Sequence, residues 1–326
     1  AGTLAALAGW GAWSLVAQQL TYAITNVSVI LWFSTWHPKL NISLHHLKDM
    51  FLFGWRIALT WMFELFARNG TILILGVFLD AAMVGLFFVA NRVFMALSNL
   101  TFWSVGEISL PVLSRLQGER QTEINASIQT LSMTTLVCLA SFWGLATVAE
   151  PLVGLLFGEQ WLGSTVPLQI LAAIGILNAI TSTCSQILVS FGHPAVSLRI
   201  QGMISLLQTI FVCIGAPFGL VAAACGIAAA FVIVAPYALW QIKKLVGVSL
   251  RSLARAQLPL WIAALTMVGA VIVVDMTWLT AQGALIRLSI GILVGMATFI
   301  GISSQTAPQL LRTVIQSLSG ALNKKK

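Results

Sequence analysis

The basic residues of this chain are confined almost entirely to alternate loops between long apolar segments. Thirteen of the seventeen Lys and Arg residues lie in one set of loops, whereas the intervening loops, around Asp80, Glu159, Pro217 and Asp275, hold none. Because basic loops are retained on the cytoplasmic side, this alternation predicts a multi-spanning membrane protein with a cytoplasmic C-terminus. The thirteen residues are Lys39, Lys48, Arg115, Arg120, Arg199, Lys243, Lys244, Arg251, Arg255, Arg312, Lys324, Lys325 and Lys326.

The composition excludes an ordinary soluble domain. Hydrophobic residues make up 59% of the chain and charged residues 8%, whereas about 25% of a soluble domain is charged. The net charge of +8 could indicate a nucleic-acid partner. However, the basic residues are spread thinly over the predicted inner loops and form no basic patch interleaved with aromatic residues. We therefore expect membrane lipids, and no nucleic acid, as partners.

A helix needs about 20 mainly apolar residues to cross the hydrocarbon layer. On this criterion the sequence predicts an all-α integral membrane protein, a bundle of about nine full transmembrane helices preceded by an N-terminal remnant of another. In the second span the turn signal Asn69-Gly70 could divide the helix, but one continuous helix preserves the charge alternation. The predicted spans are residues 12–33, 51–78, 82–106, 128–148, 166–190, 198–214, 220–240, 258–274 and 285–302.

Catalytic and metal-binding patterns are missing from the sequence. The four cysteines lie inside predicted spans, without a CxxC pair or a histidine at ligand spacing, so neither a disulfide framework nor a metal site is indicated. The sequence contains no phosphate-binding glycine motif, no nucleophile elbow and no paired carboxylates on a solvent-facing loop. We therefore expect no cofactor, no metal and no enzymatic activity.

Charged residues inside the spans are the candidate functional residues. Arg56, Glu64 and Arg68 lie within about 120° on one side of the second span, and Arg92 lies near the midplane of the third. Facing lipid, four such charges would cost about 10 to 14 kcal/mol, so we expect them to face one another or a hydrated cavity. Glu64 can neutralise only one or two of the arginines, which leaves a positive patch suited to an anion. The alternative is a structural Glu64–Arg68 pair that stabilises the helix, with the Arg56 side chain reaching toward the inner surface.

Neutral polar residues in the spans are weaker candidates. Asn178 and Gln186 belong to a polar cluster in the fifth span, where they could line a cavity or form hydrogen bonds between helices.

Five segments, in order along the chain, resemble the Wzx-type polysaccharide and lipopolysaccharide flippases of the branch that includes the colanic acid exporters. These proteins belong to the multidrug, oligosaccharidyl-lipid and polysaccharide exporter superfamily. The likeness runs over most of the chain, and the ordered set of segments is more specific than any one of them. The segments are residues 11–19 (GAWSLVAQQ), 53–54 (FG), 110–117 (LPVLSRLQ), 150–161 (EPLVGLLFGEQW) and 191–194 (FGHP).

The resemblance implies two helical lobes around a central cavity, of which this chain would hold the C-terminal part, with an N-terminal truncation. It also implies transport of an undecaprenyl-pyrophosphate-linked oligosaccharide across the bacterial cytoplasmic membrane by alternating access. Arg56, Arg68 and Arg92 are then candidates for binding the pyrophosphate, and a polysaccharide polymerase and chain-length proteins are expected partners. The expected divisions are 1–33 (end of the first lobe), 34–50 (amphipathic cytoplasmic linker), 51–241 (second lobe of six helices), 242–302 (two accessory helices) and 303–326 (basic amphipathic cytoplasmic tail).

Three alternatives stay open at this point. A drug antiporter of the same superfamily would need a net acidic cavity, which the excess of arginine disfavours. A membrane enzyme that polymerises or ligates glycans would need catalytic residues on an outer loop, and these loops are short. The third alternative is an inactive fragment that lacks its first lobe.

Overall fold

The computed structural model describes residues 5, 9–11, 13–33, 44–115, 120–279, 282–306 and 308. Within these ranges, the side chains of residues 15, 44–53, 56–57, 64, 66–69, 102–115 and 279 are outside the description. The described residues form helices joined by short turns, and no strand occurs among them. The all-α fold predicted from the sequence is confirmed.

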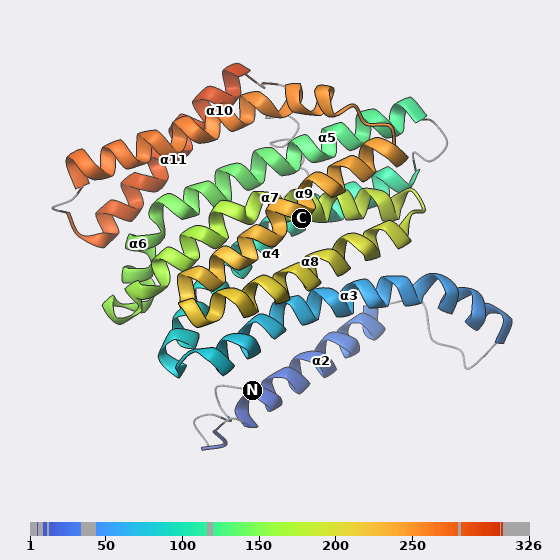
Figure 1. The fold of residues 1–326 in the computed structure, drawn as a ribbon, viewed down its shortest axis with the longest axis horizontal. Coiled ribbons are helices and arrows are strands. Elements are labelled where there is room, and N and C mark those ends of the chain that lie inside the picture. The colour runs from blue at the N-terminus through green and yellow to red at the C-terminus, as the bar shows by residue number, and fades with distance from the viewer. Residues whose placement is uncertain are drawn as a thin grey trace. The chain divides into compact units, whose positions relative to one another are not determined.

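The helices follow one another with few connecting residues (Figure 1). The predicted spans coincide with helices or with continuous runs of helical segments. Seven helical runs of the described chain, which cover the last seven of the nine predicted spans, are long and apolar enough to cross a membrane, whereas membrane crossing by residues 12–33 and 51–78 stays a prediction. The chain is therefore a multi-pass membrane protein. The elements are α2 (Trp13–Phe33), α3 (Leu44–Phe78), α4 (Ala81–Arg115), α5 (Arg120–Cys138), η1 (Leu139–Trp143), α6 (Gly144–Phe157), η2 (Glu159–Ser164), α7 (Thr165–Ser190), α8 (Pro194–Gly215), η3 (Ala216–Phe218), α9 (Leu220–Leu245), α10 (Leu250–Val274), η4 (Asp275–Leu279) and α11 (Ala284–Thr306).

The turn signal at Asn69-Gly70 does not interrupt its helix. Both residues lie inside α3, which is continuous from Leu44 to Phe78, as the charge alternation predicts. In a hydrocarbon environment a break would leave backbone N–H and C=O groups without partners, and this cost outweighs the local preference of Asn-Gly for a turn. The end of the predicted amphipathic linker, residues 44–50, is also part of α3, whereas its residues 34–43 and the tail residues 307 and 309–326 lie outside the described chain.

Several helices extend beyond the apolar segments that predict them. The helix α4 continues to Arg115, past the expected end of its span at residue 106, and α5 begins at Arg120 instead of residue 128. Hydropathy identifies only the part of a helix that crosses hydrocarbon. The backbone hydrogen bonds of the helix are equally well formed in the polar interface, so the helix does not end where the apolar sequence ends.

The chain divides into two compact units, residues 1–53 and residues 54–326. In the second unit α7 is the central helix, because it packs against α4, α5, α6, α8 and α9 (Figure 1). The helices α10 and α11 pack against each other and against the α5, η1 and α6 run. The predicted boundaries at residues 33, 50, 241 and 302 stay predictions.

Two close contacts between helices depend on small residues. Gly215 of α8 and Gly226 of α9 face the backbone of the opposite helix, where an added Cβ would lie 2.6 Å from a carbonyl oxygen of Ala222 or Phe211 respectively. The π-helical turn η1 packs Phe142 over Gly175 of α7, where an added Cβ would lie 2.5 Å from the ring. Glycine thus allows three helices of the second unit to approach closely.

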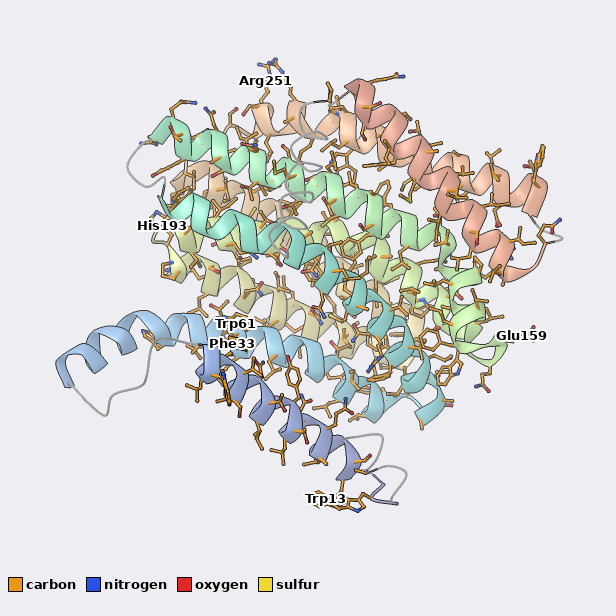
Figure 2. The ribbon with its side chains drawn as sticks, turned by 180° about the vertical axis from the view of Figure 1, so that it is seen from behind. Trp13, Phe33, Trp61, Glu159, His193 and Arg251 are labelled. Atoms are coloured by element: carbon orange, nitrogen blue, oxygen red, sulfur yellow. The ribbon has the colours of Figure 1, made fainter. Side chains whose placement is uncertain are left out.

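Basic residues are concentrated at one end of the second unit. Glu159 and His193 lie at opposite ends, and Arg251 lies toward the His193 end (Figure 2). Two of the loops predicted to be cytoplasmic, residues 191–193 and 246–249, join helices at the His193 end, and Lys243, Lys244 and Arg251 flank the second of them. Which end faces the cytoplasm stays a prediction.

Candidate functional site

A polar cavity lies in the middle of the second unit, between α3, α4, α7, α8 and α9. It has about 80 Å³ of space for water, enough for two or three water molecules, since each occupies about 30 Å³ in the liquid. Its polar lining consists of Thr71, Asn91, Ser98, Asn178, Ser182, Gln201 and Gln208. The remaining lining residues are Phe63, Phe87, Phe94, Met95, Leu171, Ile174, Ile204, Ile227 and Phe231.

Helical periodicity brings these residues to one wall of each helix. On α7 the sequence Leu171, Ile174, Asn178 and Ser182 advances by three or four residues at each step. Residues at this spacing lie above one another on the same helix face. The same spacing relates Phe87, Asn91, Phe94 and Ser98 on α4, and Gln201, Ile204 and Gln208 on α8. The cavity is therefore formed by the inner faces of neighbouring helices.

Part of the polar lining is held by hydrogen bonds. The Nε2 of Gln208 donates to Oγ1 of Thr71 at 2.9 Å, which connects α8 to α3. Ser98 donates through its hydroxyl to the Phe94 carbonyl at 2.8 Å. Ser182 donates to Oδ1 of Asn178 at 3.5 Å, a long contact. Gln208, Thr71 and Ser98 are buried, so these bonds also avoid the cost of unpaired polar atoms inside the bundle.

Other polar groups of the lining have unused hydrogen-bonding capacity. Within the described chain, the carboxamides of Asn91 and Gln201 and the amide nitrogen of Asn178 make no hydrogen bond to protein. These three residues are half-buried and come from α4, α8 and α7 respectively. The cavity can thus offer both donors and acceptors to a bound molecule.

The described side chains that line this cavity are uncharged. Arg92 is adjacent to Asn91 on α4, but its side chain is exposed and lies outside the lining. The side chains of Arg56, Glu64 and Arg68 lie outside the described residues, so the positive patch stays a prediction. From its position on α3, Arg56 stands seven residues before Phe63, which is close to two full turns, and so on the same helix face.

The two weaker candidates separate in the structure. Asn178 is part of the cavity wall, whereas Gln186 is half-buried about two turns farther along α7 and lies outside the lining. Four polar lining residues were not predicted from the sequence, namely Thr71, Asn91, Gln201 and Gln208. The sequence does contain a signal for two of them, because Gln201 and Gln208 are separated by seven residues and share one face of a mainly apolar helix.

A second, apolar cavity of about 480 Å³ lies between α4, the α5 to α6 run, α10 and α11. Its lining includes Leu97, Leu145, Met267, Ile292 and Phe299. Such a surface accommodates hydrocarbon and offers almost no group that could bind a polar ligand.

Arg287, near the start of α11, is neutralised by two carboxylates. Its Nε and Nη2 donate to Oδ1 and Oδ2 of Asp275 at 2.9 and 2.8 Å, and its Nη1 lies 3.5 Å from Oε1 of Glu150. The sequence places Arg287 inside an apolar segment with the other arginines of the spans. In the structure it connects α11 to η4 and α6, so it is a structural cation at the Glu159 end of the bundle.

Long apolar helices packed around a polar interior cavity are typical of membrane transport proteins, whose substrate sites lie near the middle of the bundle between helices. A sequence profile described as "Polysaccharide biosynthesis protein" matches residues 1–166, about half of the chain. The chain belongs to this family.

Curated relatives agree with this assignment. The succinoglycan biosynthesis transport protein ExoT of Rhizobium meliloti is 24% identical over 56% of this chain and 36% of its own length. The teichuronic acid biosynthesis protein TuaB of Bacillus subtilis is 23% identical over 48% of this chain and 33% of its own. A probable low-salt glycan biosynthesis flippase, Agl15 of Haloferax volcanii, is 23% identical over 69% of this chain and 48% of its own length. The chain spans between a third and a half of the length of these relatives.

The fold is similar to that of a solved flippase. The lipid II flippase MurJ, in an inward closed conformation, superposes with a TM-score of 0.74 over 95% of this chain and 65% of its own, at 18% identity. This similarity shows that the two proteins share a fold. The family match and the named relatives confirm the resemblance to proteins of polysaccharide biosynthesis and transport.

Proposed function

We propose that this chain forms one lobe of a flippase that moves an undecaprenyl-pyrophosphate-linked oligosaccharide from the inner to the outer leaflet of the bacterial cytoplasmic membrane. The observation that carries the proposal is the polar cavity inside a bundle of membrane-crossing helices with the fold of a lipid-linked precursor flippase. A hydrated interior lowers the cost of moving sugar hydroxyls through hydrocarbon, where each unpaired hydroxyl is unfavourable.

The three chemical parts of the substrate require three environments. The sugars need water and neutral hydrogen-bonding groups, which the cavity between α3, α4, α7, α8 and α9 provides. The prenyl chain needs an apolar environment and stays in lipid. The pyrophosphate needs cations, for which Arg56, Arg68 and Arg92 are the candidates, since guanidinium groups form strong charge-assisted hydrogen bonds to phosphate. Glu64 would weaken the electrostatic attraction between the arginines and the pyrophosphate enough for the substrate to be released, or it would carry a coupled proton.

Transport then proceeds by alternating access. The pyrophosphate enters from the end that carries the basic loops, the lobes rock about the substrate, and the opposite end opens. In this mechanism the C-terminus lies in the cytoplasm, and a polysaccharide polymerase and chain-length proteins receive the product at the outer leaflet.

A drug antiporter is less consistent with the site. A cavity that binds cationic drugs needs acidic groups, and the described lining contains neither Asp nor Glu. A polymerase or ligase would need catalytic groups on the loops of the outer end, and the described loops there are short.

The proposal is tested by substituting the candidate arginines in the natural protein, expressed in cells that lack their own copy. We expect Arg56→Ala, Arg68→Ala and Arg92→Ala each to reduce export of the lipid-linked glycan at least tenfold, because each removes about 1.5 to 3 kcal/mol of charge-assisted hydrogen bonding to the pyrophosphate. Arg92→Lys should retain part of the activity, since it keeps the charge. The measurement is the amount of surface polysaccharide in cells with equal protein levels.

The matched control is Arg251→Ala, an exposed arginine at the His193 end (Figure 2). It should export at the wild-type level. Wild-type export by all three alanine variants would overturn the assignment of the pyrophosphate site.

A further inference from the structure

Three carboxamides from three different helices meet at the polar cavity. Asn91 comes from α4, Asn178 from α7 and Gln201 from α8. Each carboxamide carries two N–H donors and an oxygen with two lone pairs. Of these groups, only the Asn178 oxygen has a hydrogen bond within the described chain, and at 3.5 Å it is a long one.

Such groups are costly in the middle of a membrane bundle unless they serve a polar partner. A fully buried unpaired donor or acceptor costs about 1 to 3 kcal/mol, and half-buried groups such as these avoid that cost through a polar molecule, water included, in the cavity. The helix faces of α4, α7 and α8 could hold apolar residues at these positions, as they do at Phe94 and Ile204. The retained amides therefore point to a polar molecule in the cavity. Asn91, Asn178 and Gln201 are half-buried, so the cavity is open enough for such a molecule to reach them.

The lining chemistry selects the class of molecule. Among the described residues, the lining offers only neutral polar groups, which are amides and hydroxyls. Amides and hydroxyls supply donors and acceptors in similar number, and a sugar hydroxyl uses both. Four phenylalanines, Phe63, Phe87, Phe94 and Phe231, add apolar surface against which the C–H face of a sugar ring can pack.

The size of the cavity limits how much of a glycan can enter. The space of about 80 Å³ holds two or three water molecules at about 30 Å³ each, so it admits part of one sugar ring and not an oligosaccharide. The cavity also lies at a known distance along α3 from Arg56, a candidate residue for binding the pyrophosphate. Arg56 stands on the face of α3 that carries Phe63, about 10 Å nearer the His193 end.

We infer that this cavity is a sugar subsite that binds one sugar unit close to the pyrophosphate, through Asn91, Asn178 and Gln201. The inference rests on the proposed function, because it assigns one part of that substrate to one place in the lobe. It predicts that the flippase distinguishes a sugar-bearing lipid from a bare lipid pyrophosphate by contacts inside a single lobe.

The test compares the binding of two lipids to the purified natural protein in detergent. One probe is undecaprenyl pyrophosphate that carries a single glucose or N-acetylglucosamine, and the other is undecaprenyl pyrophosphate without sugar. The variants Asn178→Leu and Gln201→Met replace the amides with apolar side chains of similar size, and Asn91→Leu does the same on α4. We expect each to weaken binding of the sugar-bearing lipid at least tenfold and to leave binding of the bare lipid within twofold of wild type.

The matched control is Gln186→Met, which removes a half-buried carboxamide from the same helix as Asn178 but outside the cavity lining. It should change neither affinity. Unchanged binding of the bare lipid also shows that a variant is folded. Unchanged binding of both lipids by the three cavity variants would mean that the cavity holds water only, and equal losses for both would mean that the amides act on the fold. Either result overturns the sugar subsite.

Failure of the proposed function gives a different result. A wild-type protein that binds neither lipid would contradict the flippase proposal itself. A wild-type protein that binds both lipids equally would overturn only the sugar subsite.

Discussion

Two arginines with the same sequence context behave differently in the structure. Arg92 and Arg287 both lie in apolar segments. The side chain of Arg92 is exposed beside a polar cavity, whereas the guanidinium group of Arg287 donates to both carboxylate oxygens of Asp275. Sequence distance does not predict this pairing, because Glu150, the second partner, comes from a different helix. The role of an intramembrane charge therefore depends on which carboxylates the fold brings to it.

Arg287→Met should lower the melting temperature of the protein slightly. The substitution removes a bidentate ion pair whose side chains are 20% and 34% exposed, and solvent limits the value of such a pair to about 1 kcal/mol. The measurement is fluorescence-detected thermal unfolding in detergent. Asp275→Asn should give a similar decrease, whereas Arg251→Met should give none. An Arg287→Met variant as stable as wild type would show that the pair contributes nothing to stability.

The helices of the second unit are held together at several points by glycine. Gly215 and Gly226 allow the α8 and α9 backbones to come into contact, and Gly175 accommodates the Phe142 ring that η1 presents. Without a hydrophobic driving force between helices in lipid, close backbone approach of this kind is a main source of helix association.

Gly226→Ala should destabilise the protein, by about 1 to 3 kcal/mol, as overpacking commonly does. The new methyl group would lie 2.6 Å from the Phe211 carbonyl oxygen, which is backbone and cannot turn away. The control is Gly269→Ala on α10, where an added Cβ meets nothing within 4 Å. Thermal unfolding of the two variants should show a clear decrease for Gly226→Ala and none for Gly269→Ala. Equal melting temperatures would contradict the close contact between α8 and α9.

At the scale of the whole second unit, basic residues are concentrated at one end of the bundle. The helix ends near His193 carry Arg120, Arg199, Lys243, Lys244, Arg251 and Arg255, with Glu123 among them. The opposite end carries Asp80, Glu150, Glu159 and Asp275, and its one described basic residue is Arg287. This distribution supports insertion with the His193 end in the cytoplasm.

Cysteine labelling tests this orientation. In a variant whose four native cysteines are replaced by alanine, Glu159→Cys should react with a membrane-impermeant thiol reagent in intact cells with the outer membrane permeabilised. Arg251→Cys should react only after the cytoplasmic membrane is opened. Both positions are exposed in the structure. The reverse pattern would invert the orientation and would remove the proposed route of the substrate.

The sequence alone determined the parts of this protein that depend on neighbouring residues along the chain. Apolar length predicts each span, and charge alternation predicts that α3 continues through Asn69-Gly70, because the membrane requires every span to be a complete helix. The polar cavity depends on something else. Asn178 and Gln186 look equivalent along α7, and only the packing of α4, α8 and α9 around it decides that Asn178 joins Asn91 and Gln201. The relative rotation of packed helices is set by contacts between segments far apart in the chain, so it was decided by the tertiary structure.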